Sequence, residues 1–274
     1  MKVDVMTESE TQFIEYLRSR GLAEPHRHPA LNGNKKGKRP DFGLTLNGTP
    51  LFFEVKEFAD RNIPESGSFS PYAPVYNKIE EALDQFDEYA DHPCCLVLYS
   101  RDASFVHLDP MVVFGSALGP LSWSTPIVSA NNNQSGHSFW DASKGWYWFD
   151  YQEMQPRNTH LVAIVILERF PIGYYKFSAE SDRIATETGK RMSRNEIYEL
   201  AHSRDEQGSL GERIPRIIVC QHPFAKFELS PEIYGGEFDE CFGWVPHTAR
   251  LFAGGEIQSL EALGVYPEKS PLFR

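Results

Sequence analysis

The chain has 274 residues, of which 41% are apolar and 24% charged, and its formal net charge is −11. This composition is ordinary for a globular protein, and the length is enough for one large domain or two small ones with a buried core. The N-terminal segment has no apolar run of a secretory signal, and the longest apolar run, Leu161 to Leu167, is too short to span a membrane. Four cysteines without a CxxC motif fit a reducing compartment, so we expect a cytoplasmic protein.

The charge is unevenly distributed along the chain. A net negative charge opposes binding to nucleic acid, because affinity for a phosphate backbone comes mostly from Lys and Arg. Between Arg18 and Arg39, however, there are seven basic residues and a single acid, Glu24. A local basic segment can dock a phosphate strand, although taken alone a solvated loop explains this one better.

The first predicted element is a helix over residues 7–21. Thr7 and Glu10 have the spacing of a capping box, and Gly21 can end the helix. Residues 22–38, rich in Pro, Gly, Asn and Lys, predict a loop.

Residues 40–57 predict a β-hairpin. Asn47-Gly48 separates the expected strands Asp41–Leu46 and Thr49–Glu57, and this dipeptide favours the positive φ angles that a two-residue hairpin turn needs. A polar loop with several prolines follows over residues 60–74.

An amphipathic helix is predicted over residues 75–90. Its apolar residues recur at helical spacing and form one stripe, made of Ile79, Ala82, Leu83, Phe86 and Ala90. Farther along, we expect strands at Cys94–Tyr99, Leu161–Leu167 and Arg216–Gln221, helices at Asp109–Leu118, 193–204 and Ile257–Leu263, and an irregular, aromatic-rich stretch over 119–158.

The hairpin register brings two carboxylates together. With Asn-Gly as the turn, Asp41 lies opposite Glu54, with Cβ atoms about 4.5–5.5 Å apart. Facing carboxylates repel each other, and a hard cation such as Mg²⁺ between them would explain the pair. Lys56 shares a face with Glu54, whereas Phe53 and Val55 point into the core. The Lys56 ammonium could then hold an attacking water or stabilise charge developing on a phosphate.

Glu10 projects into the apolar stripe of the first helix, which contains Phe13, Ile14 and Leu17. An unpaired buried carboxylate is costly, so a metal, the site lysine or a capping amide must satisfy it. The alternative in which Glu10 acts only in the capping box with Thr7 is equally open.

In this order, Glu10, Pro40-Asp41 and Glu54-Val55-Lys56 resemble the motif of the PD-(D/E)XK phosphodiesterase superfamily, which includes restriction endonucleases, Holliday-junction resolvases and RecB-type nucleases. The resemblance covers roughly residues 7–100. It implies an α/β (α+β) fold with a restriction-endonuclease-like core, in which helices flank a central mixed β-sheet. We expect one domain over 1–274, with this core at 1–118 and a C-terminal elaboration at 119–274 that completes the sheet.

The resemblance also assigns roles to residues. Asp41, Glu54 and the backbone of Val55 would bind Mg²⁺, for which Mn²⁺ can substitute, while Lys56 assists the water and Glu10 joins the site.

The helix after the hairpin carries a further likeness. Gln85 and Tyr89 have the QxxxY spacing of RecB-like nucleases, and we count Gln85 as a catalytic candidate at the edge of the site. The basic residues just before Asp41 are suited to gripping the nucleic-acid backbone; these are Lys35, Lys36, Lys38 and Arg39.

The sequence therefore predicts a metal-dependent nuclease, with DNA as the expected substrate, acting alone, as a homodimer or with a partner protein. The rival interpretation is a non-catalytic binding or assembly module that acts through protein partners, which the net charge of −11 fits. A separate alternative is a surface hairpin in which Glu54 and Lys56 form an ordinary ion pair. A zinc site made of Cys220, His222, Cys241 and His247 has no common ligand spacing, so we expect separate roles for these residues.

Overall fold

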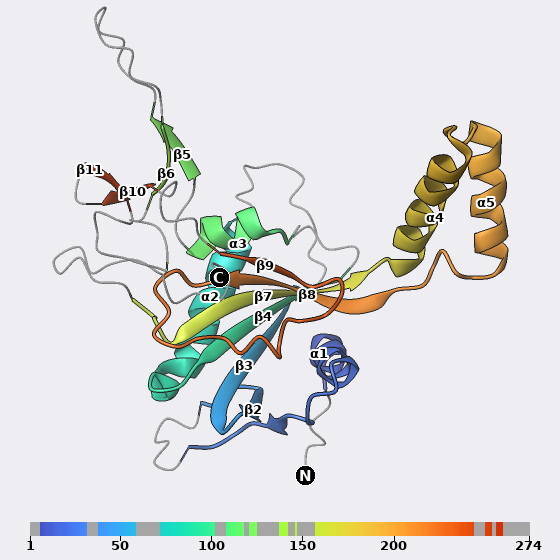
Figure 1. Ribbon diagram of the computed structural model, residues 1–274. Coiled ribbons are helices and arrows are strands. Elements are labelled where there is room, and N and C mark those ends of the chain that lie inside the picture. Colours follow the sequence, from blue (N-terminus) through green and yellow to red (C-terminus); the bar gives the residue numbers. More distant parts are fainter. Residues whose placement is uncertain are drawn as a thin grey trace, which may run out of the picture. The chain divides into compact units, whose positions relative to one another are not determined.

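The computed structural model describes residues 6–31, 38–58, 72–101, 108–117, 121–124, 137–141, 146, 157–243, 250–253 and 256–259. A seven-stranded mixed sheet has the strand order β1-β2-β3-β4-β7-β8-β9, and a four-stranded sheet has the order β11-β10-β6-β5 (Figure 1). The predicted α/β class is confirmed by this sheet and its flanking helices.

Three antiparallel strands form one side of the large sheet: β1 (His26–Arg27), β2 (Phe42–Leu46) and β3 (Thr49–Phe58). The predicted turn is confirmed, since Asn47 and Gly48 have φ angles of 49° and 83°. The predicted register is confirmed as well, because Phe42 pairs with Phe53 and Leu46 with Thr49. The loop predicted over 22–38 is wrong at β1, which is too short to carry a strand pattern and forms by pairing with β2.

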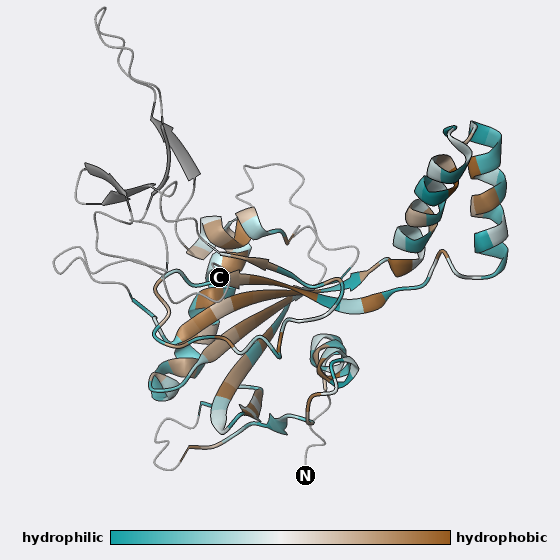
Figure 2. Cartoon of the chain, in the orientation of Figure 1, coloured by the Kyte–Doolittle hydropathy of each residue, from teal (hydrophilic) through white to brown (hydrophobic). Residues whose placement is uncertain are grey.

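Strand β3 and the two strands that follow it in the sheet order run parallel to one another. Strand β4 (Cys94–Ser100) lies between β3 and β7 (Leu161–Phe170), and the sheet continues through β8 (Ile214–Gln221) to β9 (Glu240–Phe242). The strands predicted at Cys94–Tyr99, Leu161–Leu167 and Arg216–Gln221 are confirmed, whereas β9 was not predicted. Strands buried on both faces read as continuous apolar runs, as β4 and β7 do, and most of the length of both is brown in Figure 2.

Helices cover both faces of this sheet. On one face, α1 (Glu8–Ser19) packs Phe13 against the Phe53 ring at a centroid distance of 5.0 Å. On the other face lie α2 (Ala73–Phe86) and α3 (Pro110–Ala117), which bury Ile79 and Phe86 among others (Figure 1). The predicted helices at these positions are confirmed, and among the described helices none has both the length and the apolar character needed to cross a membrane.

The end of the second helix differs from the prediction. Beyond Phe86 the chain continues as a 3-10 turn, η1 (Asp87–Tyr89), which winds more tightly than an α-helix. Tyr89 is therefore buried, whereas Ala90, the expected last member of the apolar stripe, is exposed.

The chain divides into two compact units, Met1–Leu167 with Ile217–Arg274 and Glu168–Arg216. The second unit is a hairpin of α4 (Ile172–Thr188) and α5 (Arg194–Glu206). Helix α5 confirms the helix predicted at 193–204, whereas α4 was not predicted. Helix α4 buries only Ile172 and Gly173. A helix that packs so little of its surface against a core needs no broad apolar stripe, and that stripe is the pattern by which such helices are predicted. The single domain over 1–274 stays a prediction.

The four-stranded sheet corrects two predictions. It consists of β5 (Leu121–Ser124), β6 (His137–Asp141), β10 (Arg250–Ala253) and β11 (Glu256–Ser259). The stretch predicted as irregular therefore contains two strands, and the predicted helix at Ile257–Leu263 begins as strand β11. The pairing of β6 with β10 joins segments far apart in sequence, so local periodicity does not reveal it. The other residues of the two stretches, apart from Trp146, 157 and 158, lie outside the described part of the chain.

Candidate active site

Asp41 and Glu54 are held together by main-chain hydrogen bonds. The Val55 N–H donates to Asp41 Oδ2 at 2.8 Å, and the Asp41 N–H donates to Glu54 Oε2 at 3.2 Å. The His28 N–H in turn donates to the Asp41 carbonyl oxygen at 2.9 Å. Asp41 precedes β2 instead of opening it as predicted, so its carboxylate is free to reach along β3. The two predicted carboxylates therefore lie side by side at one end of the hairpin.

Lys56 connects this pair to helix α2. Its Nζ lies 2.7 Å from Glu54 Oε1 and 3.9 Å from Glu81 Oε2. The expectation that Glu54 and Lys56 share a face is confirmed by the first contact. Glu81 also accepts a 2.8 Å hydrogen bond from Lys78, so two lysines share its carboxylate. Sequence reasoning missed Glu81, although the i, i+3 spacing of Lys78 and Glu81 was visible on the predicted helix.

The site concentrates negative charge in a buried position. Glu54 is only 3% exposed, and this burial, together with the nearby Asp41 charge, raises its pKa to about 7 against the opposing effect of Lys56. Burial also raises the pKa of Asp41, and the Glu10 charge adds to it, whereas the Val55 N–H and Lys56 lower it. Lys56 and the main-chain N–H groups thus do not fully offset the burial and mutual repulsion of the two carboxylates, which favours the approach of a cation.

Glu10 is buried at 8% exposure but is not unpaired. The Thr7 N–H donates to Glu10 Oε2 at 2.6 Å, the Glu10 N–H donates to Thr7 Oγ1, and Arg27 lies 3.6 Å from Glu10 Oε1. The capping-box alternative is therefore present, and Arg27 is a partner that sequence reasoning missed. Glu10 acts on Asp41 through its charge, and its catalytic role stays a prediction.

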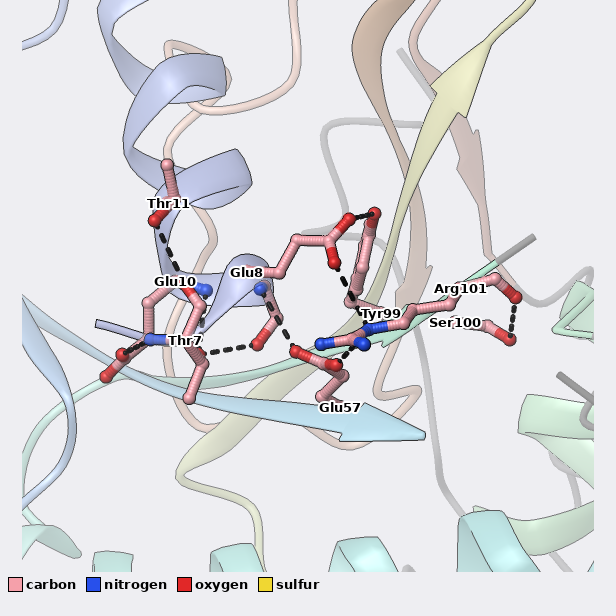
Figure 3. Close-up of polar contacts among 9 residues, drawn as sticks. Thr7, Glu8, Glu10, Thr11, Glu57, Tyr99, Ser100 and Arg101 are labelled. Carbon is pink, nitrogen blue, oxygen red and sulfur yellow. Dashed lines mark hydrogen bonds and ion pairs between the residues drawn. The ribbon is translucent and has the colours of Figure 1, made fainter. Parts of the chain in front are cut away.

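A second polar network lies on the opposite face of β3 and fixes helix α1 (Figure 3). Glu57 Oε2 accepts a hydrogen bond from the Ser9 N–H at 3.2 Å, and Glu57 Oε1 forms an ion pair with Arg101 Nε at 2.6 Å. Glu8 is 3.2 Å from the same Nε and accepts a 3.0 Å hydrogen bond from the Tyr99 hydroxyl. The network ties the start of α1 to the ends of β3 and β4, which holds the helix carrying Glu10 beside the hairpin.

The two residues of the expected QxxxY pattern differ in their surroundings. Tyr89 is fully buried and its hydroxyl donates to the Pro29 carbonyl oxygen at 2.7 Å, so its role is in packing. Gln85 is partly exposed and lies one helical turn beyond Glu81 on α2. Its place in the site stays a prediction.

The expected nucleic-acid-binding residues are only partly described. Lys38 and Arg39 are exposed just before Asp41, and Lys38 forms a 2.7 Å ion pair with Asp84 of α2. Lys35 and Lys36 lie outside the described residues.

The donor set fits a hard divalent cation. Each carboxylate oxygen can accept more than one partner, and among the described contacts Asp41 Oδ1 accepts no hydrogen bond. In the described part of the chain, no three His, Cys, Asp or Glu side chains gather closely enough to hold a metal ion. A cation here would thus rely on Asp41, Glu54 and the Val55 carbonyl, completed by water and phosphate oxygens, as Mg²⁺ prefers.

The rejected zinc set is not assembled among the described residues. His222 is buried, its Nε2 lies 3.2 Å from the Arg157 carbonyl oxygen, and its Nδ1 accepts a 3.0 Å hydrogen bond from the Phe224 N–H. Both ring nitrogens are thus engaged by main chain, and His222 is a core residue. His247 lies outside the described residues.

Compared with known proteins, the chain matches no protein-family model, no curated protein and no solved structure. The assignment of a function therefore depends on the arrangement of its own residues.

Proposed function

We propose that this chain is a metal-dependent nuclease that hydrolyses phosphodiester bonds, with DNA as the substrate to test first. The observation that carries the proposal is the arrangement of Asp41, Glu54 and Lys56. Two carboxylates from neighbouring segments are fixed by reciprocal main-chain hydrogen bonds, and a lysine on the same face lies 2.7 Å from one of them. Carboxylates and a cationic side chain in this arrangement are suited to phosphoryl chemistry.

The order of elements supports the proposal. Helix α1 precedes the antiparallel strands β1 to β3, helix α2 follows, and β4 then pairs parallel to β3. Helix, hairpin, helix and strand in this order are what the resemblance to PD-(D/E)XK phosphodiesterases implies, and Asp41, Glu54 and Lys56 lie at the hairpin.

Each residue has a separate task in this proposal. Asp41, Glu54 and the Val55 carbonyl would hold Mg²⁺ or Mn²⁺, which when bound polarises a phosphate and lowers the pKa of water. Lys56, positioned between Glu54 and Glu81, orients the attacking water and stabilises negative charge on the phosphate.

The basic residues before Asp41 can hold the substrate backbone. Lys38 would exchange its exposed ion pair with Asp84 for a phosphate. Exposed pairs contribute only about 0–1 kcal/mol, so this exchange costs little.

The test is a cleavage assay with linear, supercoiled and single-stranded DNA and with RNA, in Mg²⁺, in Mn²⁺ and in EDTA. Lys56→Ala and Asp41→Ala should abolish metal-dependent cleavage. Lys78→Ala is the matched control, because it removes a neighbouring lysine that contacts Glu81 but not Glu54. Full cleavage by both Lys56→Ala and Asp41→Ala would refute the proposal.

A second candidate is a non-catalytic module that acts through protein partners. It is favoured by the net charge of −11 and by the direct Glu54–Lys56 ion pair, which a purely structural role would also produce. Calorimetric titration with Mn²⁺ separates the two. Binding that is lost in Asp41→Ala supports the nuclease, whereas absence of both binding and cleavage supports the module.

A further inference from the structure

The cations of the α4–α5 hairpin fall into two groups. Along the helices they are neutralised by acids of the same hairpin, in the pairs Lys176–Glu212, Arg183–Glu187 and Arg204–Glu180. Around the turn between the helices, Lys190, Arg191 and Arg194 are exposed. Among the described residues these three have no acid within ion-pair distance. The hairpin thus carries unneutralised positive charge at one end.

The acid in the first turn of α5, Glu196, is already engaged. Glu196 acts in a capping box, where its Oε2 accepts a 2.6 Å hydrogen bond from the Ser193 N–H. Lys190 interacts with Glu196 only at longer range. The first turn of α5 adds its own partial positive charge beside the three cations.

An aromatic side chain lies next to this charge. Arg194, Tyr198 and His202 follow one another at i, i+4 and i+8 on α5, so they share one face of the helix. Tyr198 is 71% exposed, and its ring lies 6.2 Å from that of His202 in an edge-on arrangement. Helix α5 buries no residue and is largely hydrophilic (Figure 2), so the tyrosine is not explained by packing.

We propose that the turn and this face of α5 bind nucleic acid, with Lys190, Arg191 and Arg194 contacting phosphates and Tyr198 stacking on an exposed base. Unpaired cations interleaved with an accessible aromatic ring are the pattern by which proteins hold single strands. On a chain of net charge −11, such a cluster is where a polyanion can approach.

Other partners fit these residues less well. Of the four large exposed apolar side chains on the hairpin, three are tyrosines and Ile197 is the fourth. A helix lying on a membrane surface would instead require a broad apolar face with side chains such as Trp, Phe and Leu. The identification of the partner as nucleic acid rests on the proposed function. The arrangement of the exposed cations at the turn is observed independently of that function.

The test measures binding of labelled single-stranded and duplex DNA by the full chain in EDTA, where metal-dependent cleavage is silent. The double variant Lys190→Ala, Arg191→Ala is compared with Lys176→Ala, Arg183→Ala. Each removes one exposed lysine and one exposed arginine from the same hairpin, but the second pair of cations lies along α4, outside the turn and the α5 face, and each has an acid beside it. Unchanged far-ultraviolet spectra check that both variants fold.

Loss of two phosphate contacts should make the negative slope of log binding constant against log salt concentration on duplex DNA less steep by about 2. Near 0.1 M salt this corresponds to roughly 60-fold weaker binding. The control double variant should bind like the wild type. On single strands, Tyr198→Ala should weaken binding by roughly fivefold to 150-fold, whereas Tyr198→Phe should retain it, because the ring is kept.

Equal affinities of the two double variants would overturn the proposal. So would unchanged DNA binding by the Lys190→Ala, Arg191→Ala variant together with its loss of binding to anionic lipid vesicles. Failure of the nuclease proposal is seen separately, as absence of cleavage by a wild-type chain that still binds DNA through the hairpin.

Discussion

Replacing His222 by glutamine should make the stability of the chain less sensitive to acid. The imidazole is buried, its Nδ1 accepts the Phe224 N–H, and its Nε2 faces the Arg157 carbonyl oxygen. This arrangement fits a neutral ring with the proton on Nε2. Burial disfavours the charged ring and lowers the pKa of His222 to about 3. A second proton would also have to be placed on Nδ1, which already faces the Phe224 N–H donor.

The sign and size of the effect follow from the two pKa values. Above the unfolded-state value of 6.5, His222 is neutral in both states and its contribution is fully present. As the pH falls from 6.5 towards 3, the unfolded chain takes up a proton that the folded chain refuses, so stability is lost. Near pH 5 this loss amounts to about 2 kcal/mol, at about 1.4 kcal/mol per pKa unit.

The assay is urea unfolding of wild type and His222→Gln at a series of pH values between about 8 and 5. The variant will be less stable at pH 8, because it loses the Phe224 contact, but its stability should fall by about 2 kcal/mol less across the series. His202→Gln is the control, because it removes an imidazole that is exposed on α5 and so measures the effect on the pH dependence of losing a histidine that is not buried. Parallel pH dependences of wild type and His222→Gln would refute the reasoning.

Two further predictions concern buried polar groups. In EDTA, Glu54→Gln should gain stability relative to wild type as the pH rises from 4.5 to 7, because burial raises the folded-state pKa of Glu54 to about 7 and its ionisation then opposes folding. Thermal melting across this range checks the direction, and identical pH dependences would contradict it. Tyr16→Phe should destabilise the chain by about 1–3 kcal/mol, since the buried hydroxyl donates to the Ile233 carbonyl at 2.5 Å and lies 2.7 Å from Asp239 Oδ2. Urea unfolding measures this loss, and a change within error would show that water replaces both contacts.

Local chemistry made the hairpin predictable. Asn47 and Gly48 tolerate the positive φ angles of a tight turn, and once the turn is placed, the alternation of a strand decides which side chains face one another. The proximity of Glu54 to Lys56 and the burial of Phe53 followed from that alternation alone. The apolar runs of the central strands were equally clear, since strands covered on both faces have no polar side to show.

Partners from distant segments were decided by the tertiary structure. Arg27 beside Glu10, Glu81 beside Lys56 and Arg101 beside Glu57 meet because the strands and helices that carry them pack together. The same holds for the four-stranded sheet, whose pairing between β6 and β10 depends on chain segments that are not neighbours in sequence.

The sequence by itself determined the carboxylate pair and the lysine on one hairpin, because the turn residues and a period of two set their geometry locally. Only the tertiary structure decided how far those charges are buried and which groups from other elements neutralise them. It also decided that three cations at the turn of the α4–α5 hairpin have no acid within ion-pair distance among the described residues, since charge compensation depends on distances through space and not on spacing along the chain.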